Sequence, residues 1–330
     1  MAVSEQTSVI ESLGYVVSFI PTHSNKWSKL RKLFAIFYSG FFLRREIVKE
    51  DVNFIWFHGG EFYSLVRKYL ILSFATFLLK KKPKVILSLH SPTIENMMNS
   101  RIKKVFLSHF IKRSDCTTVV SSWWKEYIES YLPISNLFVL NNVVQSVTSE
   151  TEKVSNIERF NSRKVLFMSR LVEGKGAEVV VEVAKMLPQY SFSIAGDGPL
   201  LTTLKNRVTS LKLTNVNFLG WISDRDKAEV INSSAIFFLP SKRDSFGMGY
   251  IECMAHGVPV IGLDYKAIPS IISQGGMLVN PFNCVESSAS AIHALLSDLS
   301  KYNCYASAAL ELSEKYSPKA IAPALKEILR

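Results

Sequence analysis

Short runs of β-branched and aromatic residues alternate along this chain with longer stretches of helical periodicity, and this alternation restricts the fold more than any other feature. In the second half, the runs predict strands at 164–168, 191–195, 216–219, 235–239, 259–262 and 277–279. In the first half, they predict strands at 16–20, 54–57, 84–89, 116–120 and 137–140, with helices at 4–13, 62–79, 94–111 and 123–131. Strands separated by helices are typical of parallel sheets, so we expect an α/β fold.

The length of 330 residues and one polar stretch predict two domains. Residues 145–162 are rich in Ser, Thr, Glu and Asn and lack an apolar period, which is typical of a linker. We therefore expect two doubly wound, Rossmann-like domains that face each other across a cleft, over residues 1–150 and 151–330. A helix at 317–329 is expected to cross back to the first domain. Ligands of such sheets bind beyond the carboxyl ends of the strands.

The cysteines and the lengths of the apolar runs exclude several classes of protein. Four cysteines in this length exclude a disulfide scaffold, and none lies at the spacing of zinc ligands. The longest apolar stretches, 33–43 and 69–79, fall short of the roughly 20 residues that cross a bilayer. No segment has the pattern of a signal peptide. We therefore expect a cytoplasmic protein.

Positive charge is concentrated in the first half of the chain. Residues 1–150 carry 19 Lys and Arg against 11 Asp and Glu, whereas residues 151–330 carry 20 against 17. Within residues 25–49, basic residues stand beside aromatic residues at helical spacing, which favours a helix on an anionic membrane surface. The alternative is a helix whose apolar stripe packs into the core of the first domain. Nucleic-acid binding is disfavoured, because the basic residues are dispersed and no recognition motif accompanies them.

The loop after the first strand of the second half carries two cations and two glycines. Arg170, Gly174, Lys175 and Gly176 stand between that strand and a helix that begins at Ala177. Cations and unpaired amides at the start of a helix suit a diphosphate. The loop is not a Walker A loop, because the required glycine and hydroxyl residue are missing from its ends. Two solvated cations on a surface loop are the alternative at this point.

Two further loops follow strands of the second half. The segment 196–199 has the sequence Gly-Asp-Gly-Pro, which is typical of a tight turn before a helix. The next loop places Asp244 eight positions before Glu252, with Phe246-Gly247 at the start of a helix. A carboxylate at such a place accepts two hydroxyl hydrogen bonds, as a ribose or a hexose offers them. For Glu252, an ordinary helix N-terminal charge is the alternative.

Together, the three loops resemble those of the retaining nucleotide-sugar glycosyltransferases of family 4 (group 1), which have the GT-B fold. The family pattern is R-L-x-x-x-K-G, then G-x-G-P, then an acidic residue, F-G, and a Glu eight positions after the first acid. The chain matches it at Arg170-Leu171…Lys175-Gly176, Gly196–Pro199, Phe246-Gly247 and Glu252. The first half is similar more loosely, at His90, at Ser121 and at 140–143.

The resemblance implies a role for each matched residue. Arg170 and Lys175 would bind the donor diphosphate and stabilise the charge that develops on the departing nucleotide. Glu252 would bind the ribose, Asp244 the donor sugar, and His90 would face the sugar or the acceptor from the first domain. The other donor-binding residues would be Gly198, Ser245, Phe246, Gly247 and Met248. The family needs no bound metal or cofactor, since the nucleoside-diphosphate sugar is a co-substrate.

The implied function is transfer of a sugar, with retention, to a glycan or lipid-linked acceptor in surface polysaccharide biosynthesis. The basic and aromatic residues of 25–49 would fit an enzyme with a lipid-linked acceptor, peripheral on the inner face of the cell membrane. Two alternatives stay open: a nucleotide-sugar epimerase of similar fold, and a catalytically weakened, glycosyltransferase-like binding subunit. Two departures from the family pattern favour the weakened subunit. Asp244 stands where the family has Glu. Residues 4–13 match the helix that follows the family's first strand and Gly-rich loop, so we expect either that this strand is absent or that the chain begins downstream of it.

Overall fold

A computed structural model describes residues 2–22, 29–50, 52–144 and 154–330. The chain divides into two compact units. The C-terminal unit comprises Met1–Glu5 and Asn142–Ile321, and the N-terminal unit comprises Gln6–Asn141 and Ala322–Arg330. Helices α1 (Ala2–Ser12) and α15 (Pro318–Ile328) contribute residues to both units.

The described part of the N-terminal unit contains a four-stranded parallel sheet with the strand order β1-β2-β3-β4. The strands are β1 (Phe54–Gly59), β2 (Lys84–Leu89), β3 (Cys116–Val119) and β4 (Leu137–Val139). The helices are α2 (Lys29–Lys49), α3 (Phe62–Ala75), α4 (Ile94–Met98), α5 (Arg101–Arg113) and α6 (Ser122–Tyr131). Every residue of β2 after Lys84 is buried, which is typical of a parallel strand covered on both faces.

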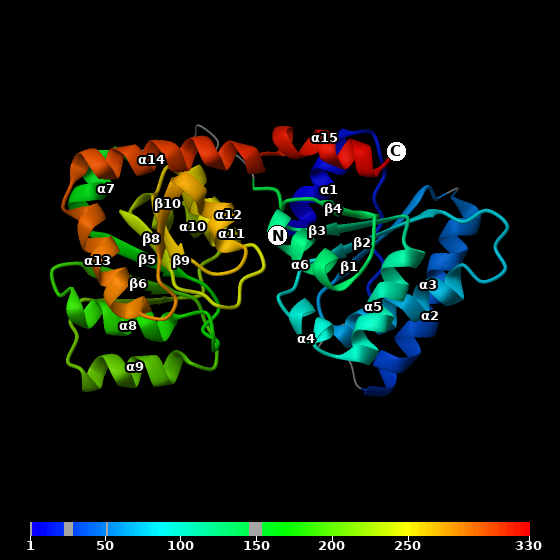
Figure 1. Ribbon diagram of the computed structural model, residues 1–330, viewed down its shortest axis with the longest axis horizontal. Coiled ribbons are helices and arrows are strands. Elements are labelled where there is room, and N and C mark those ends of the chain that lie inside the picture. Colours follow the sequence, from blue (N-terminus) through cyan, green and yellow to red (C-terminus); the bar gives the residue numbers. More distant parts are fainter. Residues whose placement is uncertain (1, 23–28, 51, 145–153) are drawn as a thin grey trace. The chain divides into compact units, whose positions relative to one another are not determined.

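The C-terminal unit contains a six-stranded parallel sheet with the order β10-β9-β8-β5-β6-β7. Its strands are β5 (Lys164–Met168), β6 (Ser191–Ala195), β7 (Val216–Gly220), β8 (Ile236–Leu239), β9 (Val260–Leu263) and β10 (Gly276–Val279). Its helices are α7 (Asn156–Ser162), α8 (Ala177–Met186), α9 (Leu201–Ser210), α10 (Asp224–Asn232), α11 (Met248–Ala255), α12 (Ile268–Ile272), α13 (Cys284–Leu296) and α14 (Leu299–Ser313). The chain moves outward from β5 to β7 on one side and from β8 to β10 on the other, so β5 and β8 flank a topological switch point (Figure 1).

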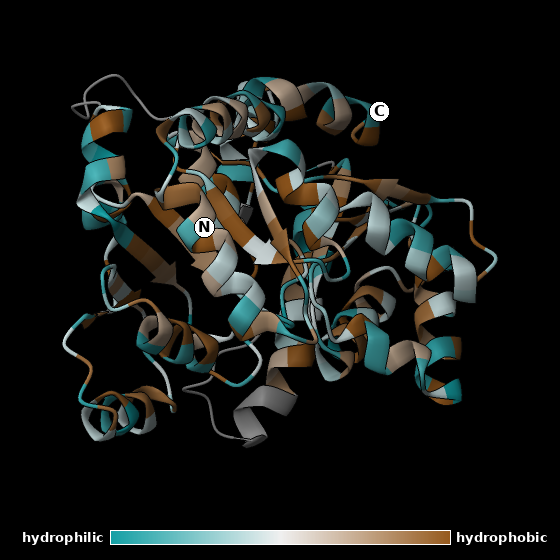
Figure 2. Ribbon diagram, turned by 60° about the vertical axis from the view of Figure 1, so that its left-hand side comes forward, coloured by the Kyte–Doolittle hydropathy of each residue, from teal (hydrophilic) through white to brown (hydrophobic). Residues whose placement is uncertain are grey.

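Apolar strands supply the core of the C-terminal unit. Phe167, Phe192, Phe237 and Phe238 are fully buried on β5, β6 and β8. Figure 2 shows hydrophobic residues gathered on the strands and hydrophilic residues along the outer sides of the helices. Because all six strands are parallel, the loops that follow β5, β6 and β8 emerge at the same edge of the sheet.

The prediction of an α/β fold with two parallel sheets is confirmed. In the C-terminal unit, every predicted strand agrees with the observed strand to within one residue at each end. The strand predicted at 16–20 is wrong, because these residues form no ladder and none of them is buried, Val16 being 97% exposed. β-Branched residues form a strand only where they can pair with a neighbouring strand and pack into a core.

Two other sequence predictions need correction. The segment 94–111 forms two helices, α4 and α5, because the extended residue Ser100 separates them. Of the predicted linker at 145–162, residues 145–153 lie outside the described residues, and Asn156–Ser162 is helix α7. Ser155 and Glu158 form a reciprocal capping box at its start, which stabilises a helix in a polar segment. Within the described ranges, no helix is both long enough and apolar enough to cross a membrane.

Candidate active site

The three loops singled out in the second half form one cluster at the carboxyl edge of the six-stranded sheet. Their backbones are joined directly: Leu171 N donates to Asp197 O at 2.9 Å, and Lys242 N donates to Gly174 O at 2.9 Å. The loops after β5 and β8 therefore meet at the switch point, with the loop after β6 beside them. This edge of a doubly wound sheet is where such folds bind their ligands.

The contact between the loops after β5 and β8 requires a glycine before α8. Gly176 has a φ of +86°, and a Cβ atom at this position would lie 2.3 Å from the carbonyl oxygen of Pro240. Helix α8 begins at the next residue, and its first amides have no partner within the helix. The positive end of the α8 dipole thus lies beside the loop that follows β8.

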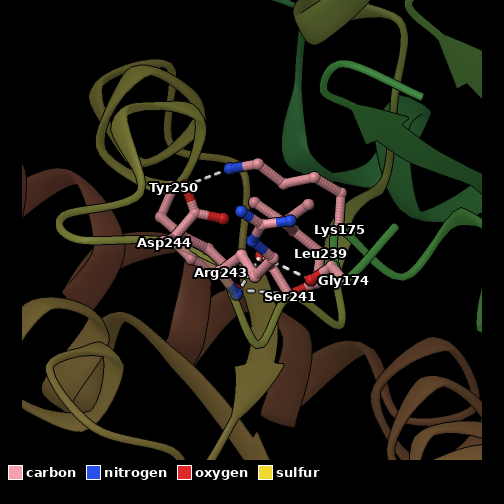
Figure 3. A network of polar contacts seen from close by, with 7 residues as sticks. All are labelled: Gly174, Lys175, Leu239, Ser241, Arg243, Asp244 and Tyr250. Carbon is pink, nitrogen blue, oxygen red and sulfur yellow. Dashed lines mark hydrogen bonds and ion pairs between the residues drawn. The ribbon is translucent and has the colours of Figure 1, made fainter. Parts of the chain in front are cut away.

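Lys175 and Asp244 form an ion pair that joins these two loops. Lys175 Nζ and Asp244 Oδ1 lie 2.7 Å apart, and the side chains are 11% and 14% exposed. Figure 3 shows Lys175 reaching toward Asp244, with Arg243 between their two loops. The other carboxylate oxygen of Asp244 is buried and has no hydrogen-bond partner. A buried acceptor that a neighbouring cation holds in place is suited to a sugar hydroxyl.

Glu252 lies on α11 and is also paired with a lysine. Lys227 on α10 places its Nζ 3.2 Å from Glu252 Oε1 and 3.2 Å from Asp224 Oδ1. Glu252 and Lys227 are 13% and 18% exposed, whereas Asp224 is 77% exposed. Lys227 therefore supplies the counter-charge of a largely buried carboxylate. An ionised carboxylate has about four acceptor sites, so Glu252 retains capacity for hydroxyl donors.

Arg170 and Gly198 belong to the same cluster of loops. Arg170 is exposed just beyond the end of β5, and its backbone carbonyl accepts from Val172 N at 3.0 Å. Gly198 N donates to the Asp197 side chain at 2.7 Å, which fixes the turn after β6. Arg170 is thus accessible to an anionic ligand, in the loop that leads to the start of α8.

The remaining predicted donor residues form the start of α11. Phe246 is buried and packs edge-on against Tyr316, with ring centroids 5.6 Å apart, so only its backbone is suited to a ligand contact. Gly247 is the N-cap of α11, and Met248 is its first residue. Ser245 is half-buried in the loop before them.

Tyr250 supports the loop after β8 from the core. Its hydroxyl donates to the carbonyl oxygen of Leu239 at the end of β8. Burial raises the pKa of Tyr250 well above its ordinary value, and the nearby Asp244 carboxylate adds to this increase. The phenol therefore stays protonated and keeps its role as a donor to the strand end (Figure 3).

His90 lies in the N-terminal unit, so it does not belong to the cluster of loops in the C-terminal unit. It follows β2 directly and pairs with His58 on the neighbouring strand β1. His58 Nδ1 and His90 Nε2 lie 2.9 Å apart, and the rings are stacked with centroids 5.1 Å apart. Trp56 also stacks on His58, and Lys68 donates to the His58 backbone carbonyl.

Burial makes this histidine pair neutral near pH 7. It lowers the pKa of His58 to about 3, with His90 and Lys68 adding to the decrease, and lowers the pKa of His90 to about 4, with Lys68 adding. Burial likewise lowers the pKa of Lys68 to about 8, with a contribution from Arg67. In a neutral pair, one ring donates to the other, so the tautomer of one histidine determines the tautomer of its partner.

Three residues of these clusters are not predicted from the sequence: Lys227, His58 and Lys68. In the sequence, Lys227 is one of several charged residues on a polar helix, and no local pattern indicates that it contacts Glu252. A usable signal existed for His58, because His58 and His90 both come at the carboxyl ends of apolar runs that were predicted as strands. Among the described residues, no group of three or more His, Cys, Asp or Glu side chains is arranged to hold a metal ion.

Comparison with known proteins places this chain among its relatives. The family model for glycosyl transferases group 1 matches residues 148–312, which is half of the chain. An uncharacterized 41.2 kDa protein in the cps region of Klebsiella pneumoniae is 27% identical over 218 residues, 61% of this chain and 58% of its own length. N-acetyl-α-D-glucosaminyl L-malate synthase of Bacillus anthracis is 30% identical over 210 residues, 58% of this chain and 52% of its own length.

Solved structures show the same fold. Anabaena HepE in complex with UDP-glucose aligns with a TM-score of 0.74 at 18% identity, covering 98% of this chain and 88% of its own. In sequence, the chain spans little more than half the length of the two curated relatives. The family match covers the three loops, the Lys175–Asp244 pair and Glu252. The chain therefore belongs to the glycosyl transferases group 1 family and has its GT-B fold.

Proposed function

We propose that this protein is a retaining glycosyltransferase that moves a sugar from a nucleoside-diphosphate sugar to a glycan or lipid-linked acceptor. The observation that carries the proposal is the Lys175–Asp244 ion pair at the switch point of the six-stranded sheet. In this pair, Lys175 is a cation that can bind a phosphate, and the adjacent Asp244 is an acceptor that can bind a sugar hydroxyl. Membership of the glycosyl transferases group 1 family supports the same assignment.

Arg170, Lys175 and the N-terminus of α8 are the groups that we assign to the donor diphosphate. The two cations come from one loop, and the first amides of α8 add the positive end of a helix dipole. When the bond between the anomeric carbon and the phosphate oxygen breaks, negative charge develops on that oxygen. Groups held there stabilise the transition state, and losing one of the cations costs about 2–4 kcal/mol by analogy with an oxyanion donor.

Two carboxylates are assigned to the hydroxyl groups of the donor. The unpartnered oxygen of Asp244 accepts from the sugar, beside the backbone of Phe246–Met248, and Glu252 accepts from the ribose. Both carboxylates are paired with lysines, which hold them in position. Gly198 and Ser245 complete the proposed donor-binding surface.

His90 is assigned to the acceptor side of the reaction. A neutral imidazole both donates and accepts, so it can bind a hydroxyl of the sugar or of the acceptor. In the proposed step, the acceptor oxygen bonds to the anomeric carbon on the face from which the diphosphate leaves. The acceptor proton passes to the departing diphosphate, which balances the reaction without a protein base.

We also propose that transfer needs no metal ion or other cofactor. The positive charge that a divalent cation would bring to the diphosphate comes instead from Arg170 and Lys175. A chelator such as EDTA is therefore expected to leave the rate unchanged, and restoration of a lost rate by Mg²⁺ would show this part of the proposal to be wrong. The setting that we propose is surface-glycan assembly at the cytoplasmic face of the cell membrane.

A thermal-shift screen with nucleoside diphosphates and their sugars tests the donor site. One base is expected to raise the unfolding temperature, and Arg170→Ala and Glu252→Ala should each abolish that shift. Lys185→Ala is the matched control, because Lys185 is an exposed cation on α8 that lies outside the loops. A screen in which no nucleoside diphosphate shifts the temperature would remove the donor assignment.

Product analysis tests the reaction class and its stereochemistry. NMR of the product sugar is expected to show the anomeric configuration of the donor. Conversion of the donor in the absence of any acceptor would instead show an epimerase. Donor binding without turnover across a broad acceptor panel would show a binding subunit.

A further inference from the structure

Helix α2 presents an aromatic side to solvent. Phe34, Phe37, Tyr38 and Phe41 follow the spacing i, i+3, i+4, i+7, so they lie along one side of the helix. They are 67%, 58%, 71% and 62% exposed. Such a stripe is ordinarily buried, and contiguous exposed apolar surface marks an interaction site.

The opposite side of α2 packs against the rest of the N-terminal unit. Its buried residues recur every four positions: Ala35, Ser39, Leu43 and Ile47. Gly40 comes so close to α3 that a Cβ atom would lie 2.7 Å from Cδ1 of Phe74. Small and aliphatic residues therefore make most of the packing contact. On the aromatic side, Phe37 also meets the Phe74 ring of α3 edge-on, with centroids 6.2 Å apart, and its side chain stays 58% exposed. The alternative in which this aromatic stripe packs into the core is wrong for the four exposed residues.

The segment after α3 enlarges the aromatic side. Arg44 on α2 donates to the backbone carbonyls of Ala75 and Phe77, which holds that segment beside α2. Phe77 and Leu78 are 65% and 81% exposed. We call the surface made by these six exposed side chains the α2 face: Phe34, Phe37, Tyr38, Phe41, Phe77 and Leu78.

Basic residues border the α2 face. Lys80, Lys81 and Lys82 follow Leu78 closely in the chain and are exposed, and Arg45 and Lys49 are exposed in the turns after Phe41. Residues 62–94 contain no Asp or Glu, and α2 contains one, Glu46. Apolar rings thus lie next to an excess of positive charge.

We propose that the α2 face binds the surface of an anionic lipid bilayer. Aromatic rings insert at the level of the headgroups, while Lys and Arg meet the lipid phosphates. A second copy of the chain fits this face less well, because a two-fold contact would bring the basic borders together. The proposal does not depend on sugar transfer, so vesicle binding and catalysis can fail independently of each other.

Vesicle sedimentation of the full chain tests the proposal. We expect binding to phosphatidylcholine vesicles that contain phosphatidylglycerol and much weaker binding to phosphatidylcholine alone. Binding should fall when salt rises from about 10 mM to about 1 M, which shortens the Debye length from about 30 Å to about 3 Å. Phe34→Ser/Phe41→Ser should lower the partition coefficient about tenfold or more, since two exposed rings no longer insert. Lys80→Ser/Lys82→Ser should lower binding to the anionic vesicles.

Exposed aromatic residues of the C-terminal unit provide matched controls. Phe282→Ser and Trp221→Ser remove rings that are 95% and 73% exposed, and both variants should bind vesicles like the parent protein. All of these substitutions are at the surface, so unchanged unfolding temperatures will show that each variant is folded. Equal binding to neutral and anionic vesicles at low salt would overturn the proposal, as would parent-like binding of Phe34→Ser/Phe41→Ser. Conversion of a dimer to a monomer by that variant, with vesicle binding unchanged, would assign the face to self-association and also overturn it.

Discussion

At the scale of single residues, the Lys175–Asp244 pair combines stability with ligand recognition. Removing one partner leaves the other as a largely buried charge. We expect Lys175→Met to lower the free energy of unfolding by about 2–3 kcal/mol, slightly less than a fully buried pair would lose. The double variant Lys175→Met/Asp244→Leu should lose less than the sum of the two single variants, because it leaves no unpaired charge.

Urea unfolding of the four proteins of this double-mutant cycle measures that coupling. Lys185→Met on α8 is the control, since an exposed lysine is expected to change stability by no more than about 0.5 kcal/mol. If Lys175→Met were no more destabilising than Lys185→Met, the pair would contribute nothing to the stability of the unit.

The buried histidines predict how stability depends on pH. Burial lowers the pKa of His58 to about 3 and of His90 and His256 to about 4, with charged or histidine neighbours adding in each case. Because these values lie below the unfolded value near 6.5, the unfolded chain binds more protons at intermediate pH. Stability is therefore fully present above about pH 6.5 and is lost as the pH falls toward about 4, with a slope of up to about 1.4 kcal/mol per pH unit per histidine.

Urea unfolding at about pH 7 and about pH 5 measures this loss. The variant His58→Phe/His90→Phe removes two of the three protonation sites, so its two curves should lie closer together than those of the parent. Equal pH dependence in the parent and the variant would show that other groups cause the acid destabilisation.

The residues of the site differ in how far the sequence could predict them. Lys175, Asp244 and Glu252 lie in short local patterns, and their places after strands follow from strand prediction. Their partners do not: Lys175 and Asp244 pair across 69 positions of the chain, and Glu252 and Lys227 across 25. Such contacts depend on which strands are neighbours in the sheet, and local sequence patterns do not predict that order.

At the scale of elements, glycine before α8 controls how closely the two donor loops approach. In Gly176→Ala, a residue with a side chain is forced to a positive φ, and its Cβ meets the carbonyl of Pro240. We expect a loss of about 3 kcal/mol or more in the free energy of unfolding, together with weaker nucleotide binding.

Gly220→Ala separates the two causes of that loss. Gly220 has a φ of +69°, but no atom lies within 4 Å of a Cβ built there, so this variant has the backbone strain without the clash. We expect Gly220→Ala to lower the free energy of unfolding by about 1–2 kcal/mol. Thermal unfolding of both variants measures the difference in stability. Equal losses of stability would show that the loops move apart to admit the Cβ atom at little cost.

The elements also show why one half of the sequence was easier to predict. Strands β5, β6 and β8 are central in their sheet, so packing on both sides enforces the apolar runs that mark them. The run at 16–20 is also β-branched and aromatic, but it pairs with no strand in the described part of the chain and none of its residues is buried. In α2, the aromatic stripe was visible in the sequence, but the sequence did not show that the stripe faces solvent. The buried side of the helix consists of small and aliphatic residues, which form a less distinct pattern than the aromatic residues of the exposed side.

At the scale of the whole molecule, the residues assigned to the nucleotide all belong to one compact unit. Arg170, Lys175 and Glu252 lie in the C-terminal unit, whereas His90 lies in the N-terminal unit. A nucleoside diphosphate without its sugar should therefore engage the C-terminal unit alone. This division follows from the fold and makes the two halves of the proposed site separable by experiment.

Hydrogen exchange with and without the nucleoside diphosphate tests this division. At a ligand concentration of about 100 times Kd, linkage stabilises the binding unit by about 2.7 kcal/mol, so its most protected amides should exchange about 100-fold more slowly. We expect this protection in β5 and β8 and in the loops that follow them, with EDTA present or absent, and no change in β1 and β2. Lys175→Ala should abolish it, because the diphosphate then loses a cation that we assign to it. Equal protection of both sheets would mean that the nucleotide also contacts the N-terminal unit, and the assignment of donor binding to the C-terminal unit alone would be wrong.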